Sequence, residues 1–308
     1  MTTEDAAPTP AHDSPTRSGI EIIEARSAEV GGFGVRRVLP RRTRRTVGAW
    51  CFVDHIGPGE VSDRHRLDVA PHPHIGLQTV TWLLEGALVH RDSLGSEQLI
   101  RPGELNVMTA GHGVAHSEET DGFRGALQGV QLWVAQPSAT RDGAPSFEHH
   151  ATLPELEVGT GTARVLVGDF SEGRSPARRD TEHVGVDLEL RTGRYEVPLR
   201  PDFEHAIVVL EGRVRSDSSG VEPGQLGYLG IGRDQVVLEC DSRCRLLLLG
   251  GVPLSESVLI WWNYVARTRE EIRLAHRDWS TGSGRFGRIV SSLPRLDGPA
   301  LPWPVPGA

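Results

Sequence analysis

The sequence contains no lysine, so all 33 of its basic residues are arginine. Without lysine the chain has no side-chain amine for a Schiff base or a pyridoxal cofactor, and it lacks the lysine of a Walker-type phosphate loop. The formal net charge of −8 gives no broad attraction to nucleic acid or to anionic lipid. We therefore expect neither nucleic acid nor a membrane to be the partner of this protein.

Cysteine and long apolar runs are also scarce. The three cysteines, Cys51, Cys240 and Cys244, are too few and too unevenly spaced for a disulfide scaffold or a paired C-x-x-C zinc site, so we expect them to be reduced and mostly buried. No apolar stretch is long enough to span a bilayer, and the start "MTTEDAAPTPAHDSPTRSG" lacks the features of a secretion signal. These absences predict a cytoplasmic protein.

Glycine and proline are abundant, with 36 and 21 residues. They interrupt short stretches of alternating apolar residues, a pattern typical of β-sandwiches and barrels. Residues 1–18 have little to bury and predict a disordered tail. The proline-rich C-terminal end is expected to dock on the body through Leu301 and Trp303. The composition therefore predicts an all-β fold.

One helix stands out, beginning at "TREEIRLAHRDW". Thr268 and Glu271 have the spacing of a capping box, and Ile272, Ala275 and Trp279 fall on one helical face. We expect this helix to pack against the β-structure.

An internal repeat sets the domain organisation. The segment "TWLLEGALVHRDSLGSEQLIRPGELNVMTAG", starting at Thr81, is echoed by "IVVLEGRVRSDSSGVEPGQLGYLGIG", starting at Ile207. Each copy has an apolar strand, a Glu-Gly turn, a polar strand, a Pro-Gly turn and a second apolar strand. The repeat predicts two similar β-domains, residues 19–150 and 151–252, with residues 253–308 forming a helix and tail that pack on them.

Four side chains of the first domain suit a metal ion. His72 and His74 flank Pro73, and residues i and i+2 of a strand point to the same face. Proline is tolerated at a strand start or edge. Because His116 and Glu118 repeat the spacing, we expect three imidazoles and one carboxylate to converge on one cation.

The second copy of the repeat serves as an internal comparison. Aligning the copies on their turns gives Pro198 and Arg200 in place of the first histidine pair, and Val237 and Glu239 in place of His116 and Glu118. The imidazoles are lost, so we expect the second domain to hold no metal.

Other polar residues near these motifs receive ordinary roles. We expect His112 to lie beside the site, because Gly111 and Gly113 argue against a zinc-binding helix there. Surface or capping roles are expected for His55, His65 and His90, supporting or loop roles for Gln78 and Glu104, and pocket-lining roles for Phe52, Asp54 and Trp82.

The long histidine-rich motifs resemble those of the pirin family of the cupin superfamily. "HPHIGLQTVTWLLEGALVHRDSLG", "IRPGELNVMTAGHGVAHSEE" and "WWNYVARTREEI" carry the resemblance, which extends over the chain outside its tails. It implies a bicupin of two stacked β-barrels, with a non-haem Fe(II) in the first barrel and none in the second. The ligands it implies are His72, His74, His116 and Glu118.

The resemblance also implies a chemistry. Some pirins are quercetinases, which open a flavonol with dioxygen, and Glu118 is then the candidate base for the substrate hydroxyl. Mn, Ni, Cu or Zn can compete for such a site because imidazole accepts all of them. Ile75, Leu77 and Gln78 stand where many relatives have Arg, Phe and Glu, which leaves the substrate preference open.

Two alternatives remain at this point. Other pirins are regulators of transcription or of metabolic enzymes, and the Arg-rich "VRRVLPRRTRRTV" is a candidate docking surface for a protein partner, although its alternation favours a strand with a solvated basic face. The metal could also be purely structural.

Overall fold

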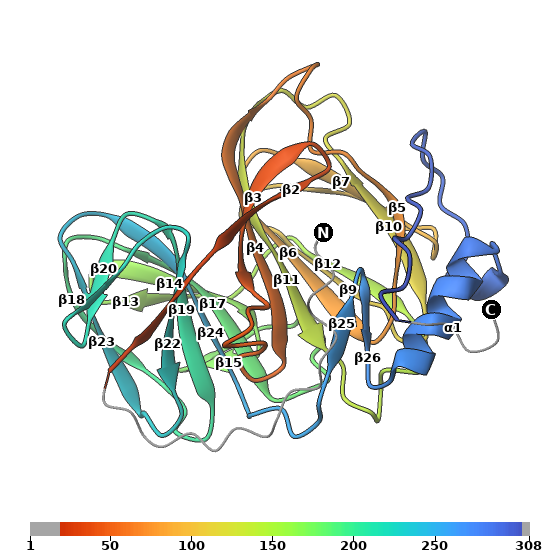
Figure 1. The fold of residues 1–308 in the computed structure, drawn as a ribbon. Coiled ribbons are helices and arrows are strands. Elements are labelled where there is room, and N and C mark those ends of the chain that lie inside the picture. The colour runs from red at the N-terminus through yellow and green to blue at the C-terminus, as the bar shows by residue number, and fades with distance from the viewer. Residues whose placement is uncertain (1–18, 304–308) are drawn as a thin grey trace.

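Two β-barrels lie side by side in the computed structural model, which describes residues 19–303 (Figure 1). Each barrel combines a seven-stranded sheet with a four-stranded sheet. The all-β bicupin architecture is therefore confirmed. The tail predicted over residues 1–18 lies outside the described residues.

The first barrel has its large sheet in the order β12-β9-β6-β11-β4-β3-β2 and its small sheet in the order β5-β10-β7-β8. The strands of the large sheet are β2 (Arg26–Val30), β3 (Phe33–Leu39), β4 (Trp50–Val61), β6 (Leu77–Glu85), β9 (Leu105–Thr109), β11 (Gly125–Ala135) and β12 (Ser146–His150). Those of the small sheet are β5 (Val69–His74), β7 (Leu88–Asp92), β8 (Glu97–Ile100) and β10 (Val114–Glu119).

The second barrel repeats this plan, with the orders β1-β22-β19-β24-β17-β14-β13 and β18-β23-β20-β21. Its large sheet contains β1 (Glu21–Glu24), β13 (Glu155–Val158), β14 (Gly161–Val167), β17 (His183–Leu190), β19 (Glu204–Glu211), β22 (Gln225–Gly230) and β24 (Cys244–Gly251). Its small sheet contains β18 (Gly193–Pro198), β20 (Val214–Ser216), β21 (Ser219–Val221) and β23 (Gln235–Cys240), and a short hairpin joins β15 (Asp169–Phe170) to β16 (Gly173–Arg174).

The first strand of the chain belongs to the second barrel. β1 pairs antiparallel with β22, with Glu21 opposite Tyr228 and Glu24 opposite Gln225. The chain then enters the first barrel at β2, so β1 links the two barrels in space (Figure 1).

The repeat predicted from the sequence forms matching strands. The first copy forms β6 to β9 and the second forms β19 to β22. In both, the Glu-Gly turn requires glycine: Gly86 has φ 90° and Gly212 has φ 71°, a region that side chains with a Cβ rarely adopt. The two copies therefore share one turn geometry.

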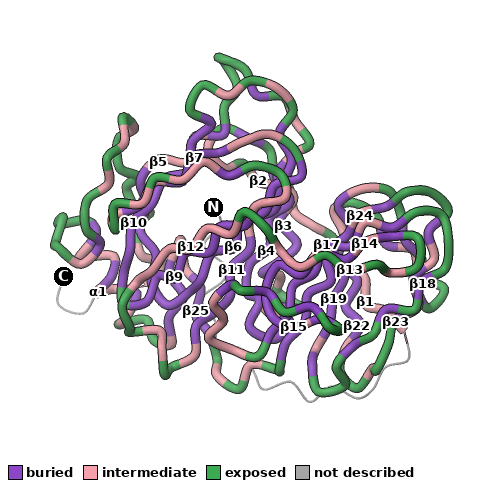
Figure 2. Tube along the Cα trace, turned by 180° about the vertical axis from the view of Figure 1, so that it is seen from behind, coloured by how far each residue is buried: buried purple, intermediate pink, exposed green. Residues whose placement is uncertain are grey.

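The large sheets of the two barrels share an apolar core. Trp50, Val80 and Trp82 of the first barrel belong to one buried cluster with Val208 and Leu247 of the second. Alternate residues of each strand supply this face, because side chains alternate across a sheet. The opposite faces line the barrel interiors, and Figure 2 shows buried chain running through both barrels.

The C-terminal segment packs on the first barrel. A hairpin joins β25 (Leu259–Trp261) to β26 (Tyr264–Ala266), and α1 (Arg269–Ser280) and a short 3-10 helix, η1 (Gly284–Phe286), follow. The Thr268 hydroxyl accepts from the Glu271 amide, so the predicted N-cap is confirmed, whereas the Glu271 carboxylate binds the Arg267 amide. The predicted helical face, formed by Ile272, Ala275 and Trp279, is buried. Leu301 and Trp303 of the C-terminal segment pack against the same cluster.

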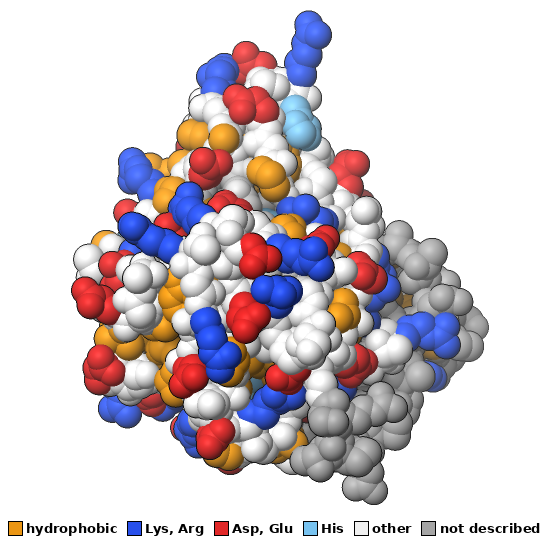
Figure 3. Space-filling model, turned by 90° about the vertical axis from the view of Figure 1, so that its left-hand side faces the viewer, with side chains coloured by type: hydrophobic (Ala, Val, Ile, Leu, Met, Phe, Trp, Pro, Cys, Tyr) orange, Lys and Arg blue, Asp and Glu red, His pale blue; other side chains and the backbone are white. Residues whose placement is uncertain are grey.

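The surface of the second barrel mixes both charges. Figure 3 shows arginine and acidic side chains interspersed over this face. Ion pairs such as Arg194 with Glu239 and Arg215 with Asp241 connect them. This face therefore offers no extended basic patch for nucleic acid.

Two further findings concern the expectations from composition. Cys51, Cys240 and Cys244 are free and buried, as predicted. Within residues 19–303, no helix combines the length and the apolar character needed to cross a membrane.

Candidate metal centre

The first histidine pair lies at the end of an edge strand. β5 is the outer strand of the small sheet, so Pro73 costs no ladder hydrogen bond there. His72 and His74 point to the same face, and β10 places His116 directly opposite His72. The strand periodicity therefore brings the three predicted imidazoles together.

The three rings have the spacing of ligands to one cation. His72, His74 and His116 offer nitrogens that lie within 4.8 Å of one another, and the Nε2 atoms of His74 and His116 are 3.0 Å apart. Two donors about 2.1 Å from one ion and at right angles to each other would be about 3.0 Å apart. This geometry fits a single metal ion.

Backbone carbonyls orient two of the rings. His72 Nδ1 donates to Ala70 O at 2.9 Å, and His74 Nδ1 donates to Asn263 O at 2.9 Å. Because a carbonyl only accepts, the proton of each neutral ring sits on Nδ1 and leaves the Nε2 lone pair free. Asn263 lies in the β25–β26 turn beside Trp262, whose φ of 52° is unusual for a residue with a side chain.

The imidazoles are kept neutral. Burial lowers the pKa of His72 to about 4. Burial, followed by the neighbouring histidines, holds the pKa values of His74 and His116 well below the usual range. Neutral imidazole is the form that binds metal, so the donor set suits a divalent cation.

Glu118 lines the same pocket as the three imidazoles. The β5–β10 ladder has an irregularity between His116 and Glu118, and Thr81 Oγ1 donates to Glu118 Oε1 at 3.0 Å. Its carboxylate also forms a second group of potential ligands with His116 and His90. Burial raises the pKa of Glu118.

The matches to known proteins cover both barrels. Residues 32–134 match the family described as Pirin, and residues 185–287 match the Pirin C-terminal cupin domain. The chain belongs to the pirin family.

The matches to individual relatives cover nearly the whole chain of this pirin. It is 42% identical over 289 residues to the Pseudomonas aeruginosa protein named "Putative quercetin 2,3-dioxygenase PA1205", covering 93% of this chain and 92% of the relative. A Caulobacter vibrioides "Pirin-like protein" is 37% identical over 293 residues, with 92% and 98% covered. The crystal structure of quercetin 2,3-dioxygenase from Acinetobacter baumannii has a TM-score of 0.90 and 41% identity, with 93% and 97% covered.

A pocket of about 580 Å³ opens beside the histidines of this pirin. Phe52 and Asp54 line it, as predicted. Trp82 does not line it: along β6 it alternates with Thr81 and faces the core between the barrels. Sequence reasoning missed Gln131, Trp133 and Trp262, which also line the pocket.

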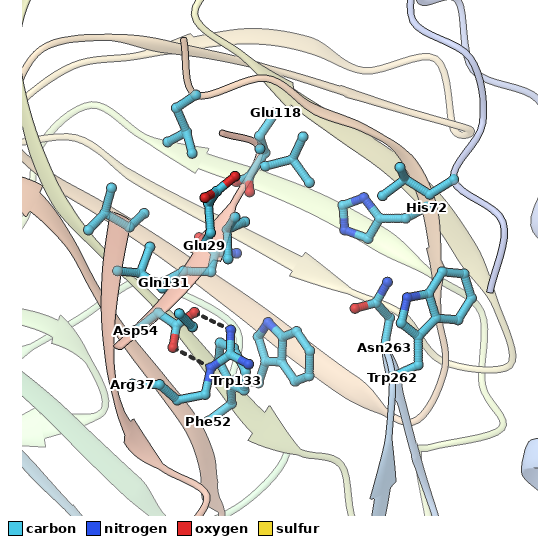
Figure 4. Close-up of a pocket in the computed structure, with 18 of the residues that line it drawn as sticks. Glu29, Arg37, Phe52, Asp54, His72, Glu118, Gln131, Trp133, Trp262 and Asn263 are labelled. Atoms are coloured by element: carbon cyan, nitrogen blue, oxygen red, sulfur yellow. Dashed lines mark hydrogen bonds and ion pairs between the residues drawn. The ribbon is translucent and has the colours of Figure 1, made fainter. Parts of the chain in front are cut away.

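Aromatic and charged side chains form the wall away from His72. Phe52 stacks on Trp133 with ring centroids 4.0 Å apart, and the Arg37 guanidinium lies 4.4 Å from the Phe52 centroid. Arg37 also donates to both Asp54 oxygens, from Nε at 2.7 Å and Nη2 at 2.6 Å (Figure 4). The pocket therefore joins a metal-binding end to an aromatic wall that carries a fixed ion pair.

The predicted solvated basic face of the Arg-rich segment is wrong for Arg37 and Arg44, whereas Arg42 is exposed. Arg37 is buried against Asp54, and Arg44 is buried over the Tyr228 ring, 3.3 Å from its centroid. Arg36 donates to Gly57 O and contacts His55. These three arginines stabilise the packing between strands, because each contacts a hydrogen-bond acceptor or an aromatic face of another strand.

The surface or capping role predicted for three histidines is correct for His65 alone. His65 is exposed, whereas His55 is buried between Arg36 and Gln128, and His90 is buried behind His116. The signal for His90 was present: it and Asp92 share the i, i+2 spacing on a strand beside β10.

The predictions for the other three polar residues, His112, Glu104 and Gln78, also have mixed outcomes. His112 is exposed and binds Gly143 O, so it takes no part in the pocket. Glu104 accepts from the Arg101 amide in its loop, as expected. Gln78 donates to Thr109 and to Arg178 O, a supporting role.

The alignment of the second barrel was shifted. The residues aligned with the histidine pair, Pro198 and Arg200, are exposed. The side chains that face the interior of this barrel from β18 and β23 are Tyr195, Val197, Val236 and Leu238. A shift of one residue moves a strand's side chains to the other face, so the interior positions carry apolar groups and offer no imidazole there.

Proposed function

We propose that this pirin is a metal-dependent dioxygenase that opens a planar, chelating substrate of the flavonol class. One observation carries the proposal: three buried, neutral imidazoles converge at the end of a pocket of about 580 Å³, and the aromatic wall of that pocket begins at Trp133, beside His74. The names of the two quercetin dioxygenases above, which share about two fifths of its residues, support the same class of substrate.

The metal ligands in this proposal are His72, His74, His116 and Glu118. Fe(II) is the proposed ion, with Mn, Ni, Cu or Zn as competitors, because three imidazoles and a carboxylate suit all of them. When bound, such an ion supplies Lewis acidity, and iron adds access to dioxygen chemistry.

The protein's own groups position the substrate. Trp133, which stacks on Phe52, gives the pocket an aromatic surface against which fused aromatic rings can pack. The Arg37–Asp54 pair is neutral overall, so it suits a hydroxyl or carbonyl group at the distal end of the substrate better than an anion.

Glu118 is the proposed acceptor of the substrate hydroxyl proton. Burial raises its pKa, which makes the ionised carboxylate a stronger base. Thr81 Oγ1 lies 3.0 Å from Glu118 Oε1 and 2.8 Å from Gln131 Oε1, and so holds the carboxylate beside a pocket-lining amide.

Metal analysis and turnover test the proposal together. Protein purified without added metal should contain close to one iron per chain, and stoichiometric zinc alone would count against iron. Anaerobic quercetin should show a shifted absorbance on the iron form, and air should then bleach it. Glu118→Gln should weaken both the shift and the bleaching, because it removes the proton acceptor and an anionic ligand, whereas full turnover in Glu118→Ala would remove the catalytic role.

Two other results would change the assignment. Protein partners that bind only in one metal oxidation state, with no turnover of flavonols, would indicate the regulatory alternative. Chelation that only lowers the melting temperature would indicate a structural metal.

The domain limits and the location are proposals of the same kind. We propose units at 19–150, 151–252 and 253–308, supported by the end of β12 at His150 and the start of β13 at Glu155, with strand β1 of the first unit added to the sheet of the second. We also propose a cytoplasmic location, which suits the three free thiols. Limited proteolysis and cell fractionation test these two proposals.

A further inference from the structure

His90 lies directly behind a proposed metal ligand. Its Nδ1 is 3.4 Å from His116 Nδ1, on the side of that ring away from His74. Its Nε2 is 3.1 Å from Asp92 Oδ2. The three side chains thus form a hydrogen-bonded series that ends at the ring whose Nε2 faces the metal position.

Asp92 is held firmly in this arrangement. Its other oxygen, Oδ1, accepts from the Leu94 amide at 2.9 Å and from the Ser96 amide at 3.0 Å. Burial opposes its ionisation, but the hydrogen bonds from His90 and Ser96 outweigh burial and hold the pKa of Asp92 below its usual value. Oδ2 is therefore a fixed acceptor aimed at His90.

This acceptor fixes the tautomers of both rings. A carboxylate accepts only, so the proton of His90 sits on Nε2 and its Nδ1 carries a lone pair. That lone pair can only receive a proton from His116 Nδ1. His116 then has its lone pair on Nε2, which is the atom that lies 3.0 Å from His74 Nε2.

The surroundings keep His90 in this orientation. Its ring stacks on Phe147, with centroids 4.3 Å apart and planes at 12°, and it is buried in β7 beside β10. His72 and His74 receive the same tautomer from backbone carbonyls. His116 receives it from a side chain, which makes this ligand the one that a point substitution can misdirect.

We propose that His90 and Asp92 are positioning residues that fix His116 in the tautomer able to bind metal through Nε2. The proposal rests on the metal site of the proposed function. It does not require that the metal performs dioxygen chemistry.

Asp92→Asn is a sharp test, because it exchanges an acceptor for a donor without changing the shape. The two backbone amides of Leu94 and Ser96 hold the Asn oxygen at the Oδ1 position, so the amide nitrogen faces His90 Nε2. His90 must then accept at Nε2 and carry its proton on Nδ1, which faces His116. The His116 Nδ1 becomes an acceptor, and its proton moves to the metal-facing Nε2.

Zinc affinity is the first readout, measured on the full chain by competition with a chromophoric chelator. Asp92→Asn should weaken Zn²⁺ binding by about 10- to 100-fold. The exposed Asp121→Asn, which removes a carboxylate that pairs with Arg91, is the matched control and should bind as the native protein does.

A double variant separates positioning from simple damage. In His90→Asn the short amide can turn its oxygen to His116 Nδ1 whatever stands at position 92. The double variant His90→Asn/Asp92→Asn should therefore bind Zn²⁺ nearly as well as His90→Asn alone. If adding Asp92→Asn weakens binding equally in both backgrounds, the residues are structural and the proposal is overturned.

Long-range ¹H–¹⁵N correlation spectra of the metal-free native protein provide a readout that needs no variant. They should show His90 protonated on Nε2 and His116 on Nδ1, and the reverse pattern at either ring overturns the proposal. If native protein binds no metal while these tautomers are present, the proposed function fails and the positioning network stands. If ¹⁵N-detected metal coordination includes His90 itself, His90 is a ligand and the proposal fails.

Discussion

Trp133 meets His74 edge-on, with ring centroids 5.2 Å apart and ring planes at 77°. The same indole stacks flat on Phe52. A planar molecule that lies against Trp133 is therefore also beside a proposed metal ligand, so this one side chain connects the proposed substrate wall to the proposed metal centre.

Substituting two tryptophans tests this connection. Trp133→Leu should weaken the binding of quercetin to the metal-loaded protein by tenfold or more, because stacking area is lost. Trp82→Leu should leave that affinity unchanged and lower the free energy of unfolding by about 3 kcal/mol, because Trp82 lies in the core between the barrels. Calorimetric titration and denaturant unfolding measure the two effects; equal losses of affinity would contradict the placement of Trp82.

The buried Arg37–Asp54 pair gives a second prediction. Asp54→Asn should destabilise the fold by about 3–5 kcal/mol, because it leaves a buried guanidinium without its counter-charge. The double variant Arg37→Met/Asp54→Leu should be more stable than Asp54→Asn, because it buries no charge. A double-mutant cycle in urea, with the single variants Arg37→Met and Asp54→Leu, measures this coupling, and additive losses would show that the pair does not act as a unit.

Metal removal should lower stability through the three imidazoles. A site bound at a metal concentration about 100 times its Kd contributes about 2.7 kcal/mol, so EDTA should reduce the melting temperature of the native protein by several degrees. In His72→Ala the chelator should change little. His112→Ala, which alters an exposed histidine outside the pocket, should respond as the native protein does.

Acid should destabilise the protein through its buried neutral histidines. Burial lowers the pKa of His55 to about 3 and the pKa values of His183 and His205 to about 4. Between these values and about 6.5 the unfolded chain binds more protons than the folded one. The contribution of these histidines to the free energy of unfolding is therefore fully present above pH 6.5 and is lost as the pH falls to about 4.

Urea unfolding in EDTA at several pH values measures this decline. His183→Gln, far from the metal ligands, should be less stable than the native protein at pH 7.5 and should lose less stability between pH 6.5 and 4.5. Parallel pH curves for the two proteins would show that His183 does not contribute.

Two glycines of the first barrel, Gly86 and Gly95, separate the cost of backbone conformation from the cost of crowding. A Cβ at Gly86 would lie 2.7 Å from Leu127 Cδ1 and 2.9 Å from Ala126 O, whereas a Cβ at Gly95 meets open space. Both have φ near 90°. Gly95→Ala should cost about 1 kcal/mol for the backbone conformation alone, and Gly86→Ala should cost more. Thermal unfolding of the pair separates conformation from crowding.

The features that sequence patterns predicted correctly are local. Residues i and i+2 on β5 and β10, the N-cap at Thr268 and the turns of the repeat each depend on a few neighbouring residues. Such patterns express the geometry of one strand or one turn, which the chain keeps in any packing.

The features that were missed depend on which face of a strand is inward and on which strand lies beside it. Trp82 and Trp133 are both apolar residues of central strands, and only the packing of the second barrel sends Trp82 away from the pocket. The carbonyl of Asn263 reaches His74 from a turn 189 residues further along the chain. Neither a propensity nor a period contains this information.

Strand β1 is made early in synthesis, yet its hydrogen-bonding partner β22 lies about two hundred residues later: Glu24 pairs with Gln225. Until the ribosome has released that later segment, Glu21–Glu24 has no sheet to join. The first barrel can therefore complete its own strand pairings before Glu21–Glu24 is paired. The joining of the two barrels by β1 is accordingly among the last steps available to a nascent molecule.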